Sequence, residues 1–217
     1  MKKRQPLPAR AILFDWDGTL LDSFAGQTRA YLAMFRVLGI TWDTCDLARY
    51  YSPNWYRVYL AARLPRDRWV EADRLWTRAY KQETPRLLPG ARKTVQALHR
   101  DFVLGIVSSG NRPRVRREIR KFRLARHFSA CVCNEDCSMK KPHPAPLKLA
   151  LARLKLDPAE CVYVGDAPED IEMARRAGVR PIGVLGPFPT AARLRAARPE
   201  VLLTSIAELP RFLKALS

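Results

Sequence analysis

Residues 11–23, AILFDWDGTLLDS, hold the strongest structural signal in this chain. The first four residues are apolar and suit a short strand that is covered on both faces, as in a parallel sheet. Asp15 and Asp17 follow at once, and Gly18 and Thr19 then break the apolar run. Ligands bind at the carboxyl ends of the strands in open α/β sheets, so we expect both carboxylates to face a ligand site.

Length and composition narrow the class of protein. The 217 residues suit one sizeable domain, or one domain with a smaller insertion. No apolar stretch is long enough to span a bilayer, and the basic start MKKRQPLPAR lacks the apolar core of a signal peptide. The five cysteines, an odd number, fit a reducing compartment. We therefore expect a cytoplasmic protein with no membrane partner.

The formal net charge of +18 is the unusual bulk property. Such a charge is found in proteins that bind nucleic acid or acidic substrates, and also on basic surfaces without a role. The densest basic run is NRPRVRREIRKFRLARHF, residues 111–128, whose apolar spacing predicts an amphipathic helix with a basic solvent face. A solvated face is the favoured interpretation, and a nucleic-acid partner is the alternative.

Two patterns of hydrophobic spacing divide the chain. Residues 23–86 are rich in Trp, Tyr and Arg, and their apolar positions recur at helical spacing. From residue 87, helices alternate with short apolar strands such as FVLGIVSS, SACVCNE, ECVYVGD and RPIGVLG. That alternation predicts a mostly parallel sheet with right-handed crossovers. We expect an α/β fold, with a Rossmann-like doubly wound core over residues 7–22 and 87–217 and an inserted small helical domain over residues 23–86.

Polar residues follow several predicted strands and should meet at one edge of the sheet. They are Asp15 and Asp17, then Ser108 and Ser109, then Lys140 and Lys141, and finally Asp166 and Asp170. Carboxylates this close repel one another, and one lysine does not balance them. A hard cation that prefers oxygen ligands, Mg²⁺, would balance them and help to bind phosphate. A metal-held carboxylate can attack phosphorus and form an aspartyl-phosphate.

Four stretches, DWDGTLLDS, VSSGN, KKPHP and GDAPEDIEMARRAG, resemble the ordered motifs of the haloacid dehalogenase (HAD) superfamily. The similarity is to its phosphoglycolate phosphatase-like branch, which carries a helical cap just after the first motif. It covers nearly the whole chain, and its first and fourth motifs are the most specific. The resemblance implies a Mg²⁺-dependent phosphatase.

The resemblance also implies roles for the residues of the first three motifs. Asp15 would be the nucleophile and a Mg²⁺ ligand. Asp17 would protonate the leaving group and then activate the hydrolytic water, while its backbone carbonyl meets the metal. Ser108 would hold the transferred phosphoryl group. Lys141, rather than Lys140, matches the Lys-Pro-x-Pro pattern and would offset charge on the nucleophile and the phosphate.

The remaining expected site residues belong to the metal and the substrate. By the same resemblance, Asp166 is a Mg²⁺ ligand, and Asp170 supports the metal or its water. The expected substrate-binding residues are Gly18 and Thr19 in the first turn, Ser109 and Asn111 after the second strand, and Arg49 and Arg57 in the helical segment. The two arginines crowd with aromatic residues in RYYSPNWYRVY, which suits an anionic or ring-bearing substrate.

Asp17 points to phosphate esters, because an alkoxide leaves far more easily when it is protonated. The expected substrate is a small phosphorylated metabolite: phosphoglycolate, a sugar phosphate or a nucleotide. One alternative is a β-phosphoglucomutase-like phosphomutase, and another is a nucleic-acid-associated basic protein with an incidental phosphatase fold. The chain is expected to be a monomer or a homodimer.

Overall fold

The strand β1 (Ala11–Phe14) lies at the centre of a six-stranded sheet. The computed structural model describes residues 9–215 of the chain. The sheet has the order β5-β4-β1-β6-β7-β8, and each neighbouring pair is parallel. Its other strands are β4 (Val103–Val107), β5 (Ala130–Val132), β6 (Cys161–Gly165), β7 (Arg180–Val184) and β8 (Val201–Leu203). Counted along the chain, this is the 3-2-1-4-5-6 order of a doubly wound fold.

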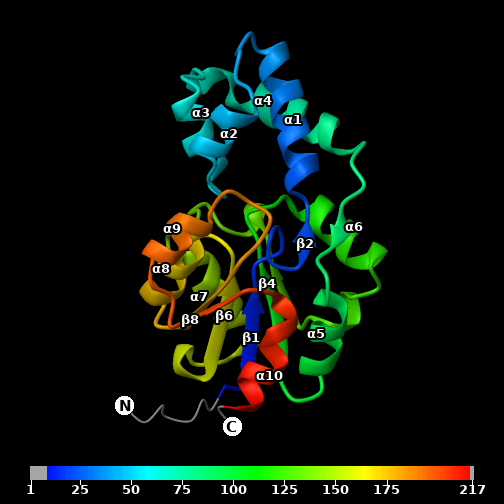
Figure 1. Cartoon of the computed structure of the whole chain (residues 1–217), viewed down its shortest axis with the longest axis vertical. Helices are drawn as coiled ribbons and strands as arrows, with labels where there is room; N and C mark the ends of the chain where they lie inside the picture. The colour runs from blue at the N-terminus through cyan, green and yellow to red at the C-terminus, as the bar shows by residue number, and fades with distance from the viewer. Residues whose placement is uncertain (1–8, 216–217) are drawn as a thin grey trace.

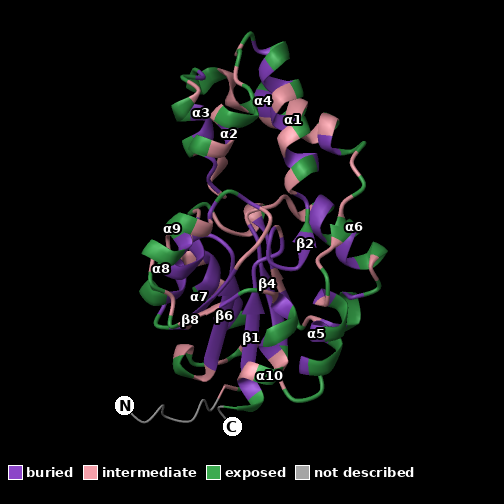
Figure 2. Cartoon of the chain, viewed as in Figure 1, coloured by how far each residue is buried: buried purple, intermediate pink, exposed green. Residues whose placement is uncertain are grey.

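Helices cover both faces of the sheet, so the central strands β1 and β6 are fully buried (Figures 1 and 2). Ile12 and Phe14 of β1 pack into one core with α5 (Ala91–Leu98), α6 (Arg112–Lys121) and α10 (Leu209–Lys214). Ala11 and Leu13 face the other core, with α7 (Ala145–Leu154) and α8 (Pro168–Arg176). The alternation follows from the period of two in a strand. The helix α9 (Ala191–Ala196) contacts α8.

A group of four helices is inserted after the first motif and stands above the carboxyl edge of the sheet in Figure 1. They are α1 (Phe24–Val37), α2 (Thr44–Tyr50), α3 (Trp55–Ala61) and α4 (Trp69–Tyr80). This helical insertion has its own apolar core, which includes Tyr31, Phe35, Leu47, Val58 and Tyr59. Its two connections to the sheet pair with each other as β2 (Leu21–Asp22) and β3 (Arg86–Leu87).

The structure confirms the expected α/β architecture with a doubly wound parallel sheet. The expected domain limits, at residues 22/23 and 86/87, fall within or beside the β2–β3 pair, whose Asp22 opposes Arg86; the division into two domains stays a prediction. The pair itself, α9 and α10 were not predicted. Short 3₁₀ turns occupy Arg66–Arg68, Ala125–His127, Asn134–Asp136, Pro158–Glu160 and Ile206–Glu208.

The basic helix α6 corrects one expectation from the sequence. Arg116, Arg117 and Arg120 are exposed as expected, but Arg114 is buried. It turns inward because a buried carboxylate, Glu118, lies one helical turn further along and pairs with it at 3.2 Å. The basic face of α6 is therefore not wholly solvated. Among residues 9–215, no helix is long and apolar enough to cross a membrane.

Candidate active site

The expected catalytic residues lie where the strand order of the sheet reverses. Asp15 directly follows β1, and Asp166 directly follows β6, its neighbour on one side. Ser108 directly follows β4, its neighbour on the other side. From β1 the chain adds β4 and β5 outward on one side of the sheet, and then β6, β7 and β8 outward on the other side. The direction of winding therefore reverses between β1 and β6, and open α/β sheets bind ligands at such a point.

Three carboxylates form a compact acidic group at this edge. Asp15, Asp166 and Asp170 each offer one oxygen, and these atoms lie within 4.8 Å of one another. All three residues are buried. The ammonium of Lys141 lies 2.6 Å from Asp15 Oδ1 and 2.8 Å from Asp170 Oδ1. One cation thus faces three carboxylates, which leaves an excess of negative charge.

Lys141 and Asp170 are held in place by neighbours on β6 and α8. The Lys141 ammonium also donates to the Tyr163 hydroxyl at 2.8 Å, and that hydroxyl lies 3.2 Å from Asp170 Oδ1. The second oxygen of Asp170 accepts the Ala167 backbone N–H at 3.1 Å, which caps the first turn of α8. Lys140, by contrast, donates to the carbonyls of Asn134 and Cys137.

The turn after β1 is fitted closely to Asp166. Gly18 has φ +86°, and a Cβ there would lie 2.3 Å from Asp166 Oδ2, so both the conformation and the space require glycine. Thr19 donates to Asp166 Oδ1 at 3.2 Å. The Thr190 hydroxyl donates to the Asp166 backbone carbonyl at 2.8 Å. Gly18 and Thr19 therefore position Asp166.

The acidic group is electrostatically strained. Burial raises the pKa of Asp15 to about 7; the Lys141 charge opposes this rise, and Asp170 and Asp17 add to it. Burial also raises the pKa of Asp166 well above its ordinary value, and the Asp15 and Asp170 charges add to the effect. A divalent cation between the oxygens would relieve this repulsion.

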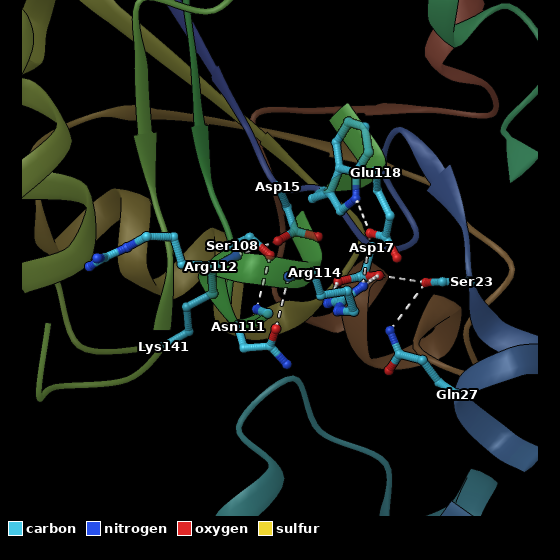
Figure 3. A network of polar contacts seen from close by, with 12 residues as sticks. Asp15, Asp17, Ser23, Gln27, Ser108, Asn111, Arg112, Arg114, Glu118 and Lys141 are labelled. Carbon is cyan, nitrogen blue, oxygen red and sulfur yellow. Dashed lines mark hydrogen bonds and ion pairs between the residues drawn. The ribbon is translucent and has the colours of Figure 1, made fainter. Parts of the chain in front are cut away.

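Asp17 points into a different network, drawn in Figure 3. The Arg114 guanidinium binds both carboxylate oxygens of Asp17, at 2.9 and 2.6 Å. The Ser23 hydroxyl donates to Asp17 Oδ1 at 2.7 Å, and Gln27 donates to Ser23 Oγ at 3.1 Å. Glu118 accepts from Arg114 and also, at 2.9 Å, from the indole N–H of Trp16.

In this second network the charge of Arg114 directly offsets the charge of Asp17. Burial pushes the pKa of Asp17 upward, but the Arg114 charge and its hydrogen bonds outweigh burial and leave the pKa below its ordinary value. Arg114 also lies over the rings of Tyr80 and Trp76 in α4, at 5.1 and 5.9 Å from their centroids. The Asp17 carboxylate is thus linked through Arg114 to the helical insertion.

A cavity of about 260 Å³ lies between the acidic group and the helical insertion. Of the residues expected at the site, Asp15, Asp17, Ser109, Asn111, Asp166 and Asp170 line it. The Asn111 side chain accepts the Arg114 backbone N–H and so caps α6. Ser108 is buried, and its hydroxyl accepts the Gly110 N–H at 3.0 Å.

Arg49 and Arg57 lie outside this cavity. Both are exposed; Arg49 packs over the Tyr50 ring, and Arg57 lies 3.8 Å from Glu169. Their substrate-binding role stays a prediction without support from the cavity lining. Sequence reasoning missed Arg114, Glu118, Ser23 and Tyr163. An inward Arg114 could have been suspected from its spacing of four residues to Glu118 in a helix otherwise so basic.

The side chains present fit a magnesium ion. The acidic group offers buried carboxylate oxygens, the donor type that Mg²⁺ prefers, and its negative charge exceeds that of Lys141. The side chain of Asp17 is not part of the group, so its expected metal contact rests on its backbone carbonyl alone.

Comparisons with known proteins agree with this geometry. A family model described as "Haloacid dehalogenase-like hydrolase" matches residues 12–184. The phosphoglycolate phosphatase of Escherichia coli (strain K12) is 29% identical over an alignment of 228 positions, which covers 92% of this chain and 90% of that protein. The phosphoglycolate phosphatase of Salmonella typhimurium is likewise 29% identical over the same share of each chain.

Solved structures extend the likeness to the fold. A haloacid dehalogenase-like hydrolase from Bacteroides fragilis superposes with a TM-score of 0.85 at 25% identity, over 93% of this chain and 99% of that one. CbbY from Rhodobacter sphaeroides, solved in complex with phosphate, gives a TM-score of 0.79 at 26% identity, over 93% and 96%. The likeness therefore takes in the sheet and the helical insertion together.

Proposed function

The chain belongs to the haloacid dehalogenase-like hydrolase family and is a phosphatase of that family, and we propose that it hydrolyses a small phosphorylated metabolite through an aspartyl-phosphate on Asp15, with Mg²⁺ as cofactor. The observation that carries the proposal is the surroundings of Asp15. This carboxylate lies at the point where the strand order reverses, lines the cavity and lies 2.6 Å from Lys141 in the acidic group.

In the first half of the reaction, a carboxylate oxygen of Asp15 attacks phosphorus as the bond from phosphorus to the leaving oxygen breaks. Asp17 must leave Arg114 and take up a proton before it can give one to that oxygen, so that the product departs as an alcohol. Lys141 offsets the charge on Asp15 and on the phosphoryl oxygens, and Ser108 donates a hydrogen bond to the phosphoryl group. When bound, Mg²⁺ supplies charge stabilisation to the carboxylates and the phosphoryl group.

In the second half, water attacks the phosphorus of the aspartyl-phosphate. Asp17, now ionised, takes a proton from this water, and the bond between phosphorus and Asp15 breaks to release phosphate and restore the carboxylate. Gly18 and Thr19 keep Asp166 beside Asp15 throughout. The helices of residues 23–86 act as a cap that excludes bulk water from this chemistry.

The test measures phosphate release from a panel of phosphorylated metabolites, with and without Mg²⁺. Asp15→Asn should reduce turnover by at least about 10⁴-fold, as expected for loss of a nucleophile. Acid quenching during turnover, followed by mass spectrometry, should find the phosphoryl group on the peptide that contains Asp15. Asp22→Asn is the matched control, because Asp22 belongs to the same stretch but is exposed and lies outside the cavity.

Retained turnover in Asp15→Asn would contradict the assignment of the nucleophile. If a bisphosphorylated sugar is converted into its isomer with no free phosphate, the phosphomutase alternative is correct instead. Tight binding of a polyanion that persists in Asp15→Asn with a steep salt dependence would favour the nucleic-acid alternative. The cytoplasmic location and the monomeric or homodimeric state stay predictions.

A further inference from the structure

The two sides of the cavity differ in chemistry. The sheet side carries the acidic group and Asp17, which together would handle the phosphoryl group. Half of the lining residues from the helical insertion are aromatic, among them Tyr31, Trp55, Tyr59 and Trp76. This side of the cavity also contributes one carboxylate, Asp73 of α4. In the proposed reaction the leaving group faces this side.

Within the described part of the chain, no free cation lines the cavity. Arg114 is the one basic residue that lines the cavity, and its guanidinium already binds both oxygens of Asp17 and lies 3.2 Å from Glu118. Lys140 packs over the Trp55 ring, at 5.7 Å from its centroid, but it donates to two backbone carbonyls and does not line the cavity. Arg57 lies outside the cavity near Glu169.

Asp73 is held in a fixed orientation at this side of the cavity. The hydroxyl of Tyr59, a buried residue, donates to Asp73 Oδ1 at 2.9 Å. Asp73 is only half-buried and therefore keeps contact with the space that it lines. A fixed carboxylate among aromatic rings attracts hydroxyl or ammonium donors and repels anions.

We propose that Asp73 selects phosphate monoesters whose leaving group has no negative charge and offers a hydroxyl or ammonium donor. This inference rests on the proposed phosphatase function and narrows its substrate class. The carboxylate of phosphoglycolate would be desolvated beside Asp73 with no free counter-ion in the cavity lining, since Lys140, whose charge reaches Asp73, is held by two backbone carbonyls outside it. An unpaired charge in such a place is costly. A hydroxyl or an ammonium group instead hydrogen-bonds Asp73, while the aromatic rings cover the carbon skeleton.

The test compares three esters of similar size: phosphoglycolate, glycerol 1-phosphate and phosphoethanolamine. For the wild-type chain with Mg²⁺, kcat/KM for the neutral or the cationic ester should exceed that for phosphoglycolate by about tenfold or more, about 1.4 kcal/mol. Comparison of glycerol 1-phosphate with phosphoethanolamine shows whether Asp73 prefers a hydroxyl or an ammonium donor. p-Nitrophenyl phosphate serves as a general phosphatase substrate.

Asp73→Asn keeps an acceptor for Tyr59 and removes the charge. The ratio of kcat/KM for the neutral or cationic ester to kcat/KM for phosphoglycolate should fall by about fivefold or more, chiefly because KM for phosphoglycolate falls. The matched control is Glu71→Gln, which removes an exposed charge from the same helix, outside the cavity, and should leave the preference unchanged. Thermal unfolding of both variants checks that the fold is kept.

Two results would overturn the inference while leaving the proposed function intact. One is a wild-type enzyme that hydrolyses phosphoglycolate best. The other is a preference that Asp73→Asn does not change. If no ester, p-nitrophenyl phosphate included, is hydrolysed with Mg²⁺, the proposed function itself fails.

Discussion

Asp15 and Asp17 are separated by a single residue, yet the fold gives them opposite electrostatic surroundings. Asp15 shares one lysine with two further carboxylates, and its pKa is raised to about 7 by burial, against the pull of Lys141. Burial also acts on Asp17, but the bidentate pair with Arg114 outweighs it, and the pKa of Asp17 falls below its ordinary value. We call these surroundings the Asp15 network and the Asp17 network.

The difference shows how one short turn can serve two chemical roles. The Asp15 network has excess negative charge, so it needs a cation from outside the chain. The Asp17 network takes its cation from α6, so the carboxylate keeps its charge and position without metal. In this arrangement both oxygens of Asp17 are engaged, and Arg114 or Ser23 must yield for Asp17 to meet a leaving group.

Within the Asp17 network, the largest effect should come from removing the Asp17 carboxylate. We expect Asp17→Asn to lower turnover of alkyl phosphates by about 10²–10⁴-fold, because general acid–base catalysis is lost. With p-nitrophenyl phosphate, whose leaving group needs no proton, the aspartyl-phosphate should still form on Asp15 and then accumulate. Acid quenching followed by mass spectrometry measures this accumulation. Near-normal hydrolysis of alkyl esters by the variant would show that the two networks do not divide the chemistry in this way.

The next effect should follow from breaking the Asp17 network at its cation. Arg114→Ala leaves the buried Glu118 and the largely buried Asp17 without their cation, so the free energy of unfolding should fall by about 3–5 kcal/mol. Turnover of alkyl phosphates should also fall, by about 10²-fold, because Asp17 loses its orientation. Chemical denaturation and steady-state kinetics measure the two effects.

Arg120→Ala is the matched control for this variant, since Arg120 is an exposed arginine on the same helix. It should change neither stability nor turnover by much. Arg114→Lys should recover part of the stability but less of the turnover, because lysine cannot bind both oxygens in the same fork. Equal losses of stability and turnover in Arg114→Ala and Arg120→Ala would mean that the change in net charge, rather than the Asp17 network, causes them.

The smallest effect concerns the stability of the metal-free protein against pH. The folded pKa of Asp15, about 7, lies above the unfolded value of about 4, so the folded state holds the proton more tightly. The Asp15 contribution to stability is therefore greatest below about pH 4 and is lost as the pH rises towards 7. In the wild type this loss lowers the free energy of unfolding by up to about 1.4 kcal/mol per pH unit, and Asp15→Asn should not show it.

The measurement is denaturant unfolding of metal-free protein between pH 5 and 8, with wild type and Asp15→Asn side by side. Asp17→Asn should lower stability and change the slope less than Asp15→Asn does, because the Asp17 carboxylate is ionised throughout this range and its charge is only a lesser cause of the raised pKa of Asp15. Mg²⁺ should stabilise the wild type more at pH 8 than at pH 5. A parallel pH dependence for wild type and Asp15→Asn would contradict the charge imbalance assigned to the Asp15 network.

Much of the fold could be read from local pattern. Short apolar runs such as residues 11–14 and 161–165 became buried central strands, because strands covered on both faces are apolar throughout. Small elements such as α9, α10 and the β2–β3 pair were missed, since they have few residues and weak periodicity. The helical spacing of apolar residues predicted the inserted helices, and the apolar core that they share agrees with this.

The sequence by itself determined which residues end the parallel strands, and with them the meeting of Asp15, Ser108 and Asp166 at one edge of the sheet. Only the tertiary structure decided which charges face one another. It turned Arg114 inward to Asp17, left Arg49 and Arg57 outside the cavity, and brought Asp73 into its wall. The physical reason is that the ends of parallel strands follow from local pattern and connection rules, whereas the partner of a long charged side chain depends on how separate helices pack.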